Sequence, residues 1–274
     1  MKTRSKKIKI NKRKMFFSVS ILVLGIILVL IIALFVRNNF KSDGKEEFRE
    51  EKIILNFEDR INKSLEYKYE DYLTVGWLQV QGTNIDFPVL NFDSANDGDI
   101  DVNYLYRSSY YESGENREVI VGHNIINVSS VPIRNMSKLK NFEALMTFTY
   151  EDFAKENLYI SYTKNGKKEL YKIYAAGFYE YVTMNEASLS NLEETKEYIK
   201  NAKQESIYDY NVDVNENDKL ISLKTCTRYF GLDGKGAFII DARKVREDEE
   251  IIRYEVKTNK NYNQLSDGVS NENL

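Results

Sequence analysis

The chain of 274 residues contains one cysteine, Cys226, and one histidine, His123. A thiolate is a strong nucleophile, and a neighbouring imidazole can take up the thiol proton or stabilise the thiolate. Any thiol or imidazole chemistry of this protein must therefore use these two residues. The same counts exclude an intramolecular disulfide, a multi-cysteine zinc or iron–sulfur site and a histidine-rich metal site.

Each of the two residues follows a predicted strand. His123 comes directly after the apolar run 118–122, in which Gly122 lets the backbone turn, and Cys226 follows the apolar run 220–223. Loops at strand ends often carry function. The two residues are 226 − 123 = 103 positions apart, so only the fold could bring them together. For each residue alone, a structural role stays as open as a catalytic one.

The net charge of −3 conceals a basic head and an acidic body. Residues 1–14 hold eight basic residues and no acidic one, whereas all 42 acidic residues lie beyond residue 37. Between them, residues 15–36 are uncharged and apolar, and as a helix they would span about 33 Å, the thickness of a bilayer core. This stretch is too long for a cleaved signal peptide. We predict an uncleaved transmembrane signal anchor.

The anchor predicts a single-pass protein of the cell membrane. By the positive-inside rule, the basic segment 1–14 is expected in the cytoplasm and the body of the chain outside the cell. A basic N-terminus can also bind nucleic acid, but the apolar segment that follows it argues against a nucleic-acid partner. The lone cysteine is then extracytoplasmic, where an odd cysteine is a candidate reactive thiol.

The body of the chain reads as many short strands with a few inserted helices. Beyond a linker at 37–46 we predict one domain over 47–250, with N-terminal helices within 47–70, and a polar tail over 251–274. Asn165-Gly166 predicts a hairpin between strands. A capping-box pattern at 190–193 predicts a helix to about Ala202. This pattern favours a β-barrel or sandwich decorated with helices.

Four short segments resemble, in order, the signature segments of class B sortases, which are membrane-anchored cysteine transpeptidases of Gram-positive bacteria. They are Val75-Gly76-Trp77-Leu78, Gly82-Thr83-Asn84-Ile85-Asp86-Phe87-Pro88-Val89, Gly122-His123-Asn124 and Ser222-Leu223-Lys224-Thr225-Cys226. The last resembles the family motif Thr-Leu-x-Thr-Cys, with Ser222 in place of the first threonine. The resemblance covers roughly residues 45–245. It implies a mainly β fold, an eight-stranded sortase barrel with inserted helices and an N-terminal helical extension.

The resemblance also implies a reaction. The Cys226 thiolate would attack a peptide carbonyl in a sorting signal and form a thioacyl-enzyme, while His123 would protonate the leaving amine and deprotonate the incoming one. The implied partners are secreted proteins with a C-terminal sorting signal, and peptidoglycan or its lipid-linked precursor as the amine acceptor. The resemblance implies no cofactor and no metal.

One position departs from the family. Class B sortases have an arginine at the start of the strand after the cysteine loop, where it holds substrate or the developing oxyanion; here that position is Ala237. We predict that Arg228 or Lys235 supplies the charge. Arg228 is favoured because a guanidinium offers a forked pair of donors, although the role of a solvated loop residue stays equally open for it.

Two other functions stay open. The first is a catalytically weak or inactive sortase-like barrel that acts as a membrane-tethered peptide-binding module. The second is a cysteine peptidase that only hydrolyses its substrate. The acidic stretch 93–101 is more typical of a solvated surface than of a calcium site.

Overall fold

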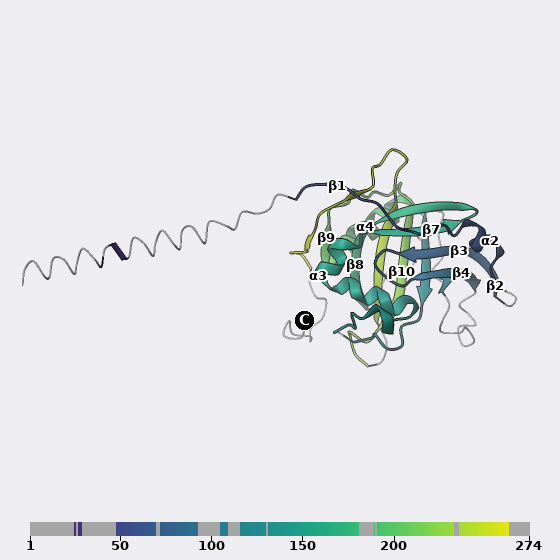
Figure 1. The fold of residues 1–274 in the computed structure, drawn as a ribbon, viewed down its shortest axis with the longest axis horizontal. Coiled ribbons are helices and arrows are strands. Elements are labelled where there is room, and N and C mark those ends of the chain that lie inside the picture. Colours follow the sequence, from purple (N-terminus) through teal and green to yellow (C-terminus); the bar gives the residue numbers. More distant parts are fainter. Residues whose placement is uncertain are drawn as a thin grey trace, which may run out of the picture. The chain divides into compact units, whose positions relative to one another are not determined.

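The computed structural model divides the chain into two units, residues 1–49 and residues 50–274 (Figure 1). The described residues are Gly25, Ile27, Leu28 and the ranges 48–69, 72–92, 105–108, 116–129, 131–180, 189, 191–232 and 236–262.

The predicted membrane segment, 15–36, lies outside the described residues except for Gly25, Ile27 and Leu28, which are helical. The basic head 1–14 and the linker 37–46 lie outside them entirely. Among the residues that are described, no helix has both the length and the apolar character needed to cross a membrane.

The second unit is built on a nine-stranded sheet that closes on itself. In sheet order the strands are β2 (Lys68–Tyr69), β3 (Tyr72–Val80), β4 (Asp86–Phe92), β5 (Leu105–Ser108), β6 (Arg117–Gly122), β10 (Leu220–Thr227), β11 (Gly236–Lys244), β8 (Lys167–Glu180) and β7 (Tyr159–Lys164). Because β3 also pairs with β7, the two sides of the sheet meet and form a barrel. The predicted mainly β barrel is confirmed.

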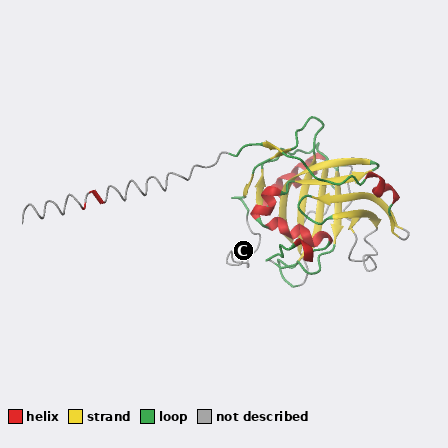
Figure 2. Ribbon diagram, in the orientation of Figure 1, coloured by secondary structure: helices red, strands yellow, loops and turns green. Residues whose placement is uncertain are grey.

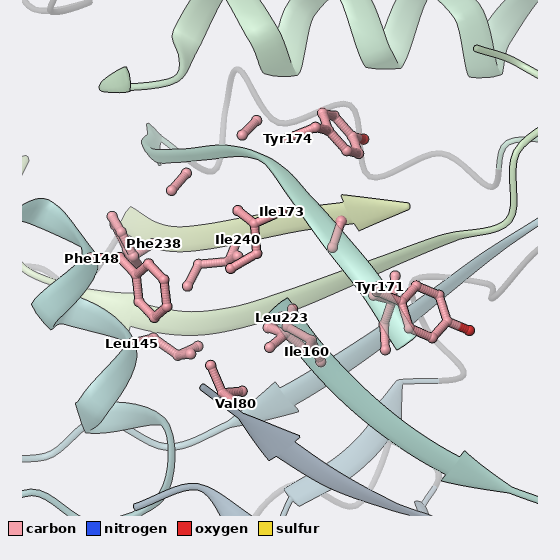
Figure 3. Close-up of a cluster of buried hydrophobic side chains, with 14 of the residues drawn as sticks. Val80, Leu145, Phe148, Ile160, Tyr171, Ile173, Tyr174, Leu223, Phe238 and Ile240 are labelled. Carbon is pink, nitrogen blue, oxygen red and sulfur yellow. The ribbon is translucent and has the colours of Figure 1, made fainter. Parts of the chain in front are cut away.

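The inside of the barrel is filled by apolar side chains that alternate along the strands. Figure 3 shows Leu223 and Ile240, which are paired on the neighbouring strands β10 and β11, together with Ile160 from β7 and with Leu145 and Phe148 from a 3₁₀ helix. All five are fully buried, and each such side chain contributes roughly 1.5–3 kcal/mol of burial energy. This packed interior supports the strands β6 and β10, which carry the chain to His123 and Cys226.

The hairpin between β7 and β8 forms where it was predicted. Asn165 and Gly166 connect the strands with positive φ angles of 52° and 70°. Two consecutive positive φ angles match a type I′ turn, whose twist suits an antiparallel hairpin. Asn tolerates this region better than most residues, and Gly adopts it freely.

The predicted helix after the capping-box pattern also forms, as α4 (Leu192–Glu205). Its N-cap is Asn191, whose side chain accepts a hydrogen bond from the Glu194 backbone N–H at 2.9 Å. The other helices after β6 are η3 (Met136–Lys138), η4 (Asn141–Thr149) and α3 (Glu151–Glu156). Figure 2 shows α2 at one end of the strands and α3 and α4 toward the other.

The N-terminal helices predicted within 47–70 are mostly wrong. Only α2 (Ile61–Glu66) forms there, preceded by β1 (Glu51–Lys52) and an extended segment. In that segment Ile53, Leu55 and Phe57 pack against the core while Ile54 is 90% exposed. This alternation has the period of an extended chain, not of a helix, and β1 is held by pairing with β12 (Ile252–Arg253).

The predicted polar tail begins later than residue 251. Residues 252–253 form β12, and β13 (Val256–Thr258) pairs with β9 (Tyr208–Tyr210). Between them, Tyr254 is buried, and its hydroxyl lies 2.6 Å from the Leu158 carbonyl oxygen. Buried apolar area therefore fixes the chain to the barrel through this region. Residues 263–274 lie outside the described residues.

A carboxylate joins α2 to the barrel. Asp86 Oδ1 on β4 accepts hydrogen bonds from Arg60 Nε at 2.9 Å and from Trp77 Nε1 at 2.6 Å. Burial raises the pKa of Asp86, but the Arg60 and Trp77 hydrogen bonds outweigh it, so the pKa lies below its ordinary value. Two of the motif residues, Trp77 and Asp86, thus stabilise the fold.

We expect Asp86→Asn to lower the free energy of unfolding by about 1–3 kcal/mol, because charge-assisted hydrogen bonds are lost and an amide N–H₂ can face Arg60. Urea unfolding at neutral pH measures this difference. Glu66→Gln, at an exposed acid of α2, is the matched control and should unfold like the native protein. Equal stability of the Asp86→Asn variant would contradict the prediction.

Candidate active site

The structure brings His123 and Cys226 to adjoining ends of two neighbouring strands. β6 and β10 run parallel, and their register ends with Gly122 opposite Thr225. His123 and Cys226 each follow by one residue, and neighbouring strands lie about 4.8 Å apart. The Thr225 hydroxyl donates a 2.7 Å hydrogen bond to the Gly122 carbonyl oxygen, which ties the two strand ends together.

Cys226 and His123 are more exposed than the buried residues that precede them in the chain. Leu223 faces the core, so the alternation along β10 places Cys226 on the outer face of the barrel. Cys226 is exposed and His123 is half-buried. A thiol in this position is open to a large substrate.

Gly122 is required where the chain leaves β6. A Cβ atom there would lie 2.7 Å from Leu105 Cδ2 and 2.8 Å from Phe142 Cγ. Both neighbours are fully buried core side chains, so they have little room to move. The glycine therefore lets the His123 loop start directly over the core.

The loop after His123 is fastened to the end of β10. Asn124, which is buried, donates from Nδ2 to the carbonyl oxygen of Cys226 at 2.9 Å. Two residues after Cys226, the Arg228 backbone N–H donates to the Val128 carbonyl oxygen at 2.9 Å. The segments that carry the imidazole and the thiol are therefore held to each other by hydrogen bonds on both sides of Cys226.

A buried carboxylate accepts hydrogen bonds from the backbone of this loop. Glu143, on η4, accepts backbone N–H hydrogen bonds from Ile125 at 3.0 Å and Ile126 at 2.9 Å. Its carbonyl oxygen accepts from Asn127 Nδ2 at 2.7 Å. Sequence reasoning did not identify Asn124 or Glu143 as supporting residues, and nothing in the local sequence of Glu143 points to the distant loop.

Ala237, where the resemblance predicts an arginine, is a buried residue. Ala237 on β11 lies directly opposite Cys226 in the antiparallel register. It is fully buried and packs with Tyr179 and Ile239. Directly opposed residues share one face of a sheet, so an arginine here would lie beside the thiol, but Ala237 supplies no charge.

Arg228 and Lys235 were predicted to supply the missing positive charge, and the structure describes only Arg228. Arg228 is exposed on the turn after β10, and within the described part of the chain its guanidinium makes no hydrogen bond or ion pair. It is therefore available to a substrate. Lys235 lies outside the described residues. A third cation, Lys224, is buried on the same strand and the same face as Cys226, two residues before it.

A buried polar network attaches α4 to the outer face of these strands. The Tyr198 hydroxyl of α4 donates to Asp241 Oδ1 on β11 at 2.7 Å and accepts from Arg117 Nη2 on β6 at 2.7 Å. Arg117 Nε also donates to Ser222 Oγ on β10 at 2.9 Å. Burial raises the pKa of Asp241 against the opposing effects of Arg117, Ser222 and Tyr198. The residue that replaces the motif threonine, Ser222, is thus part of the α4 attachment.

The arrangement suits covalent acyl transfer. A thiol and an imidazole, the groups that such chemistry uses as nucleophile and as general acid–base, stand at adjoining strand ends, and an exposed arginine follows the cysteine by two residues. Among the described residues, no cluster of three or more His, Cys, Asp or Glu side chains is placed to hold a metal ion.

Two curated proteins with similar sequences are both sortase B proteins. No protein-family model matches the chain. Sortase B of Listeria monocytogenes is 27% identical over 187 residues, which cover 62% of this chain and 69% of that protein. Sortase B of Staphylococcus aureus is 22% identical over 222 residues, 74% of this chain and 88% of that protein.

Solved structures agree with these relatives at the level of the fold. The crystal structure of Clostridium perfringens sortase B matches with a TM-score of 0.51 and 23% identity, over 68% of this chain and 97% of that one. Sortase B from B. anthracis, in complex with AAEK2, matches with a TM-score of 0.50 and 17% identity, over 69% and 81%. The resemblance to class B sortases is confirmed, and the barrel has a sortase-like fold.

Proposed function

We propose that this protein is a membrane-anchored cysteine transpeptidase that cleaves a sorting signal in secreted proteins and joins them to a cell-wall peptide amine. The observation that carries the proposal is that the sole cysteine and the sole histidine stand at adjoining ends of β6 and β10. The likeness to sortase B proteins in sequence and fold supports it.

In the first half-reaction, the Cys226 thiolate attacks the scissile carbonyl carbon and forms a C–S bond. The tetrahedral intermediate collapses, the C–N bond breaks, and His123 gives a proton to the leaving amine. The product is a thioacyl-enzyme. The exposure of Cys226 is what a protein substrate requires, since the peptide must reach the thiol without the barrel opening.

In the second half-reaction, the amine of a cell-wall peptide attacks the thioester carbonyl. His123 takes up the amine proton, the C–S bond breaks and the thiolate is restored. We propose peptidoglycan or its lipid-linked precursor as the acceptor. The apolar segment 15–36 supports a place at the outer side of the cell membrane, with residues 1–14 in the cytoplasm.

The test uses the full-length protein in detergent with C-terminal peptides of secreted proteins and short peptides that carry free amines. Mass spectrometry should show a thioacyl adduct on Cys226, and the amine peptides should convert it to an amide product. Failure of Cys226 to form any adduct would favour the peptide-binding module. An adduct that only hydrolyses, whatever amine is added, would favour the peptidase.

We propose that Arg228 stabilises the oxyanion in place of the family arginine, with Lys235 as the other candidate. Removing one oxyanion donor typically costs about 10²–10³-fold in rate, so we expect Arg228→Ala to slow thioacyl-enzyme formation by about that factor. Rapid-quench mass spectrometry measures this rate. Lys196→Ala, at an exposed cation of α4, is the control.

Equal acylation rates for Arg228→Ala and the control variant would overturn the assignment of Arg228. The same assay on Lys224→Met would then show whether the buried lysine of β10 provides the charge instead. Lys224→Arg keeps the positive charge and separates a loss of charge from a loss of packing.

A further inference from the structure

We infer that Glu143 is a positioning residue for the acyl transfer: it holds the loop after β6 so that His123 stays beside Cys226. This inference rests on the proposed function. Glu143 lies on η4, outside the four motif segments, and among the described residues its hydrogen bonds go to neither of the reacting side chains. Its effect would pass through the backbone of the loop.

The carboxylate of Glu143 makes three hydrogen bonds to backbone N–H groups. Oε1 accepts from both Ile125 and Ile126, and Oε2 accepts from Lys140 at 3.0 Å. The residue is only 6% exposed. Hydrogen bonds to an ionised acceptor are stronger than neutral ones, and they strengthen further away from water. Two of the three bonds fix the residues that follow His123 and Asn124.

A second set of bonds, which starts at the backbone of Glu143, links η4 to Cys226. The Glu143 carbonyl oxygen accepts from Asn127 Nδ2 at 2.7 Å, and the Asn127 N–H donates to Asn124 Oδ1 at 3.0 Å. Asn124 Nδ2 in turn donates to the carbonyl oxygen of Cys226. A continuous path of hydrogen bonds therefore runs from η4, through the loop, to the backbone of the nucleophile.

At Ile125 and Ile126, hydrogen bonds hold the loop more than packing does. Ile125 and Ile126 are 57% and 52% exposed, so burial of their side chains contributes little to fixing the loop. Without the carboxylate, two N–H groups would have to find other partners, and the loop would keep only the Asn127 bond to the η4 backbone. A displacement of about 1 Å in a reacting group can cost about 10²-fold in rate.

A role limited to stabilising η4 makes a different prediction. The bond from the Lys140 N–H to Oε2 caps η4, and its loss alone would lower stability without changing the chemistry. The bonds from Ile125 and Ile126 do not belong to η4. Loss of these bonds should change the rate of the chemical step while the barrel remains folded.

The experiment compares Glu143→Ala, Glu143→Gln and Glu143→Asp in the full-length protein in detergent, at a temperature where circular dichroism shows each to be folded. We measure kcat and KM for thioacyl-enzyme formation with a sorting-signal peptide and the rate of Cys226 alkylation by iodoacetamide at pH 7. Glu151→Gln, at an exposed acid of α3 that pairs with Lys155, is the matched control.

We expect Glu143→Ala to lower kcat by about 10²-fold with little change in KM, and to alkylate at the rate of a His123→Gln variant. Glu143→Asp keeps the charge and should recover part of kcat. A folded Glu143→Ala with kcat and alkylation rate like the control would overturn the inference. If Glu143→Ala does not fold, Glu143→Gln decides by the same two readouts.

The two proposals fail separately. If the native protein forms no thioacyl-enzyme with any peptide, the proposed function fails. The alkylation rate still tests Glu143, because it needs only the imidazole and the thiol. An unchanged alkylation rate in a folded Glu143 variant would then reject the positioning role as well.

Discussion

Replacing Cys226 by alanine is expected to abolish thioacyl-enzyme formation and transpeptidation completely. The chain has no second thiol. The hydroxyls next to Cys226 in β10 cannot substitute for it, because Thr225 and Thr227 are both fully buried and Thr225 donates to Gly122. Mass spectrometry of the protein after incubation with the peptide pool checks the adduct, and product analysis with an amine peptide checks the transfer.

Loss of the imidazole should be severe but incomplete. We expect His123→Gln to slow acylation by about 10²–10⁴-fold, the usual contribution of a general acid–base group. Groups that act as one unit are not additive, so the double variant should be no worse than Cys226→Ala. Both single variants should melt like the native protein because neither side chain is in the core. An acyl adduct at any residue of the Cys226→Ala variant, or an amide product from it, would contradict the assignment of the nucleophile.

The two reacting residues could be found from the sequence because the chain offers no alternatives to them. Their proximity could not be predicted from local patterns. It depends on the parallel pairing of β6 with β10, whose residues lie about a hundred positions apart and have no turn between them to set the register. The resemblance to class B sortases implied that the two residues act together, which periodicity could not show.

Glu143 was missed for a related reason. It stands in a mainly apolar 3₁₀ segment, and its local sequence accounts for only one of its bonds, the cap to Lys140. The partners that matter for the site, Ile125 and Ile126, come from a loop on the other side of η3. A buried acid that serves a distant backbone leaves no spacing signal.

The helices predicted within 47–70 and the polar tail predicted from residue 251 were wrong for the same reason. Ile53 and Phe57 fit a helical spacing, but Leu55 fits only an extended chain, and the pairing of β1 with β12 decides between the two. The segment that follows β12 looked polar because few of its residues are apolar. Its buried residue Tyr254 stabilises the fold through the core that it packs in and through carbonyl groups that lie far away in the sequence. Partners that are distant in sequence override a weak local pattern.

The largest expected effect on stability is at Glu249. Arg243 on β11 and Lys172 on β8 are directly opposite in the antiparallel register, and both are buried. Like charges in opposed positions repel. Glu249 lies between them: its carboxylate accepts from Arg243 Nη1 at 2.6 Å, from Arg243 Nη2 at 2.7 Å and from Lys172 Nζ at 2.7 Å. The pair of cations depends on this one acid.

We expect Glu249→Gln to lower the free energy of unfolding by about 3–5 kcal/mol, the usual cost of leaving buried charge uncompensated. Urea unfolding at pH 7 measures this loss. Glu250→Gln is the matched control, since its ion pair with Lys52 is exposed and should contribute little. A Glu249→Gln variant as stable as the control would show that the two cations are solvated in the native state.

The same site predicts the response to acid. Burial raises the pKa of Glu249, but hydrogen bonds from Arg243, Lys172 and the Arg246 N–H outweigh it and lower the pKa from 4.5 to about 2. A lowered pKa stabilises the fold above the unfolded value and loses this effect as the pH falls through the folded one. The native protein should therefore lose stability between pH 4.5 and about 2. Over that interval Glu249→Gln should lose less, so the two unfolding curves should converge in acid; a constant gap between them would exclude Glu249 as the titrating group.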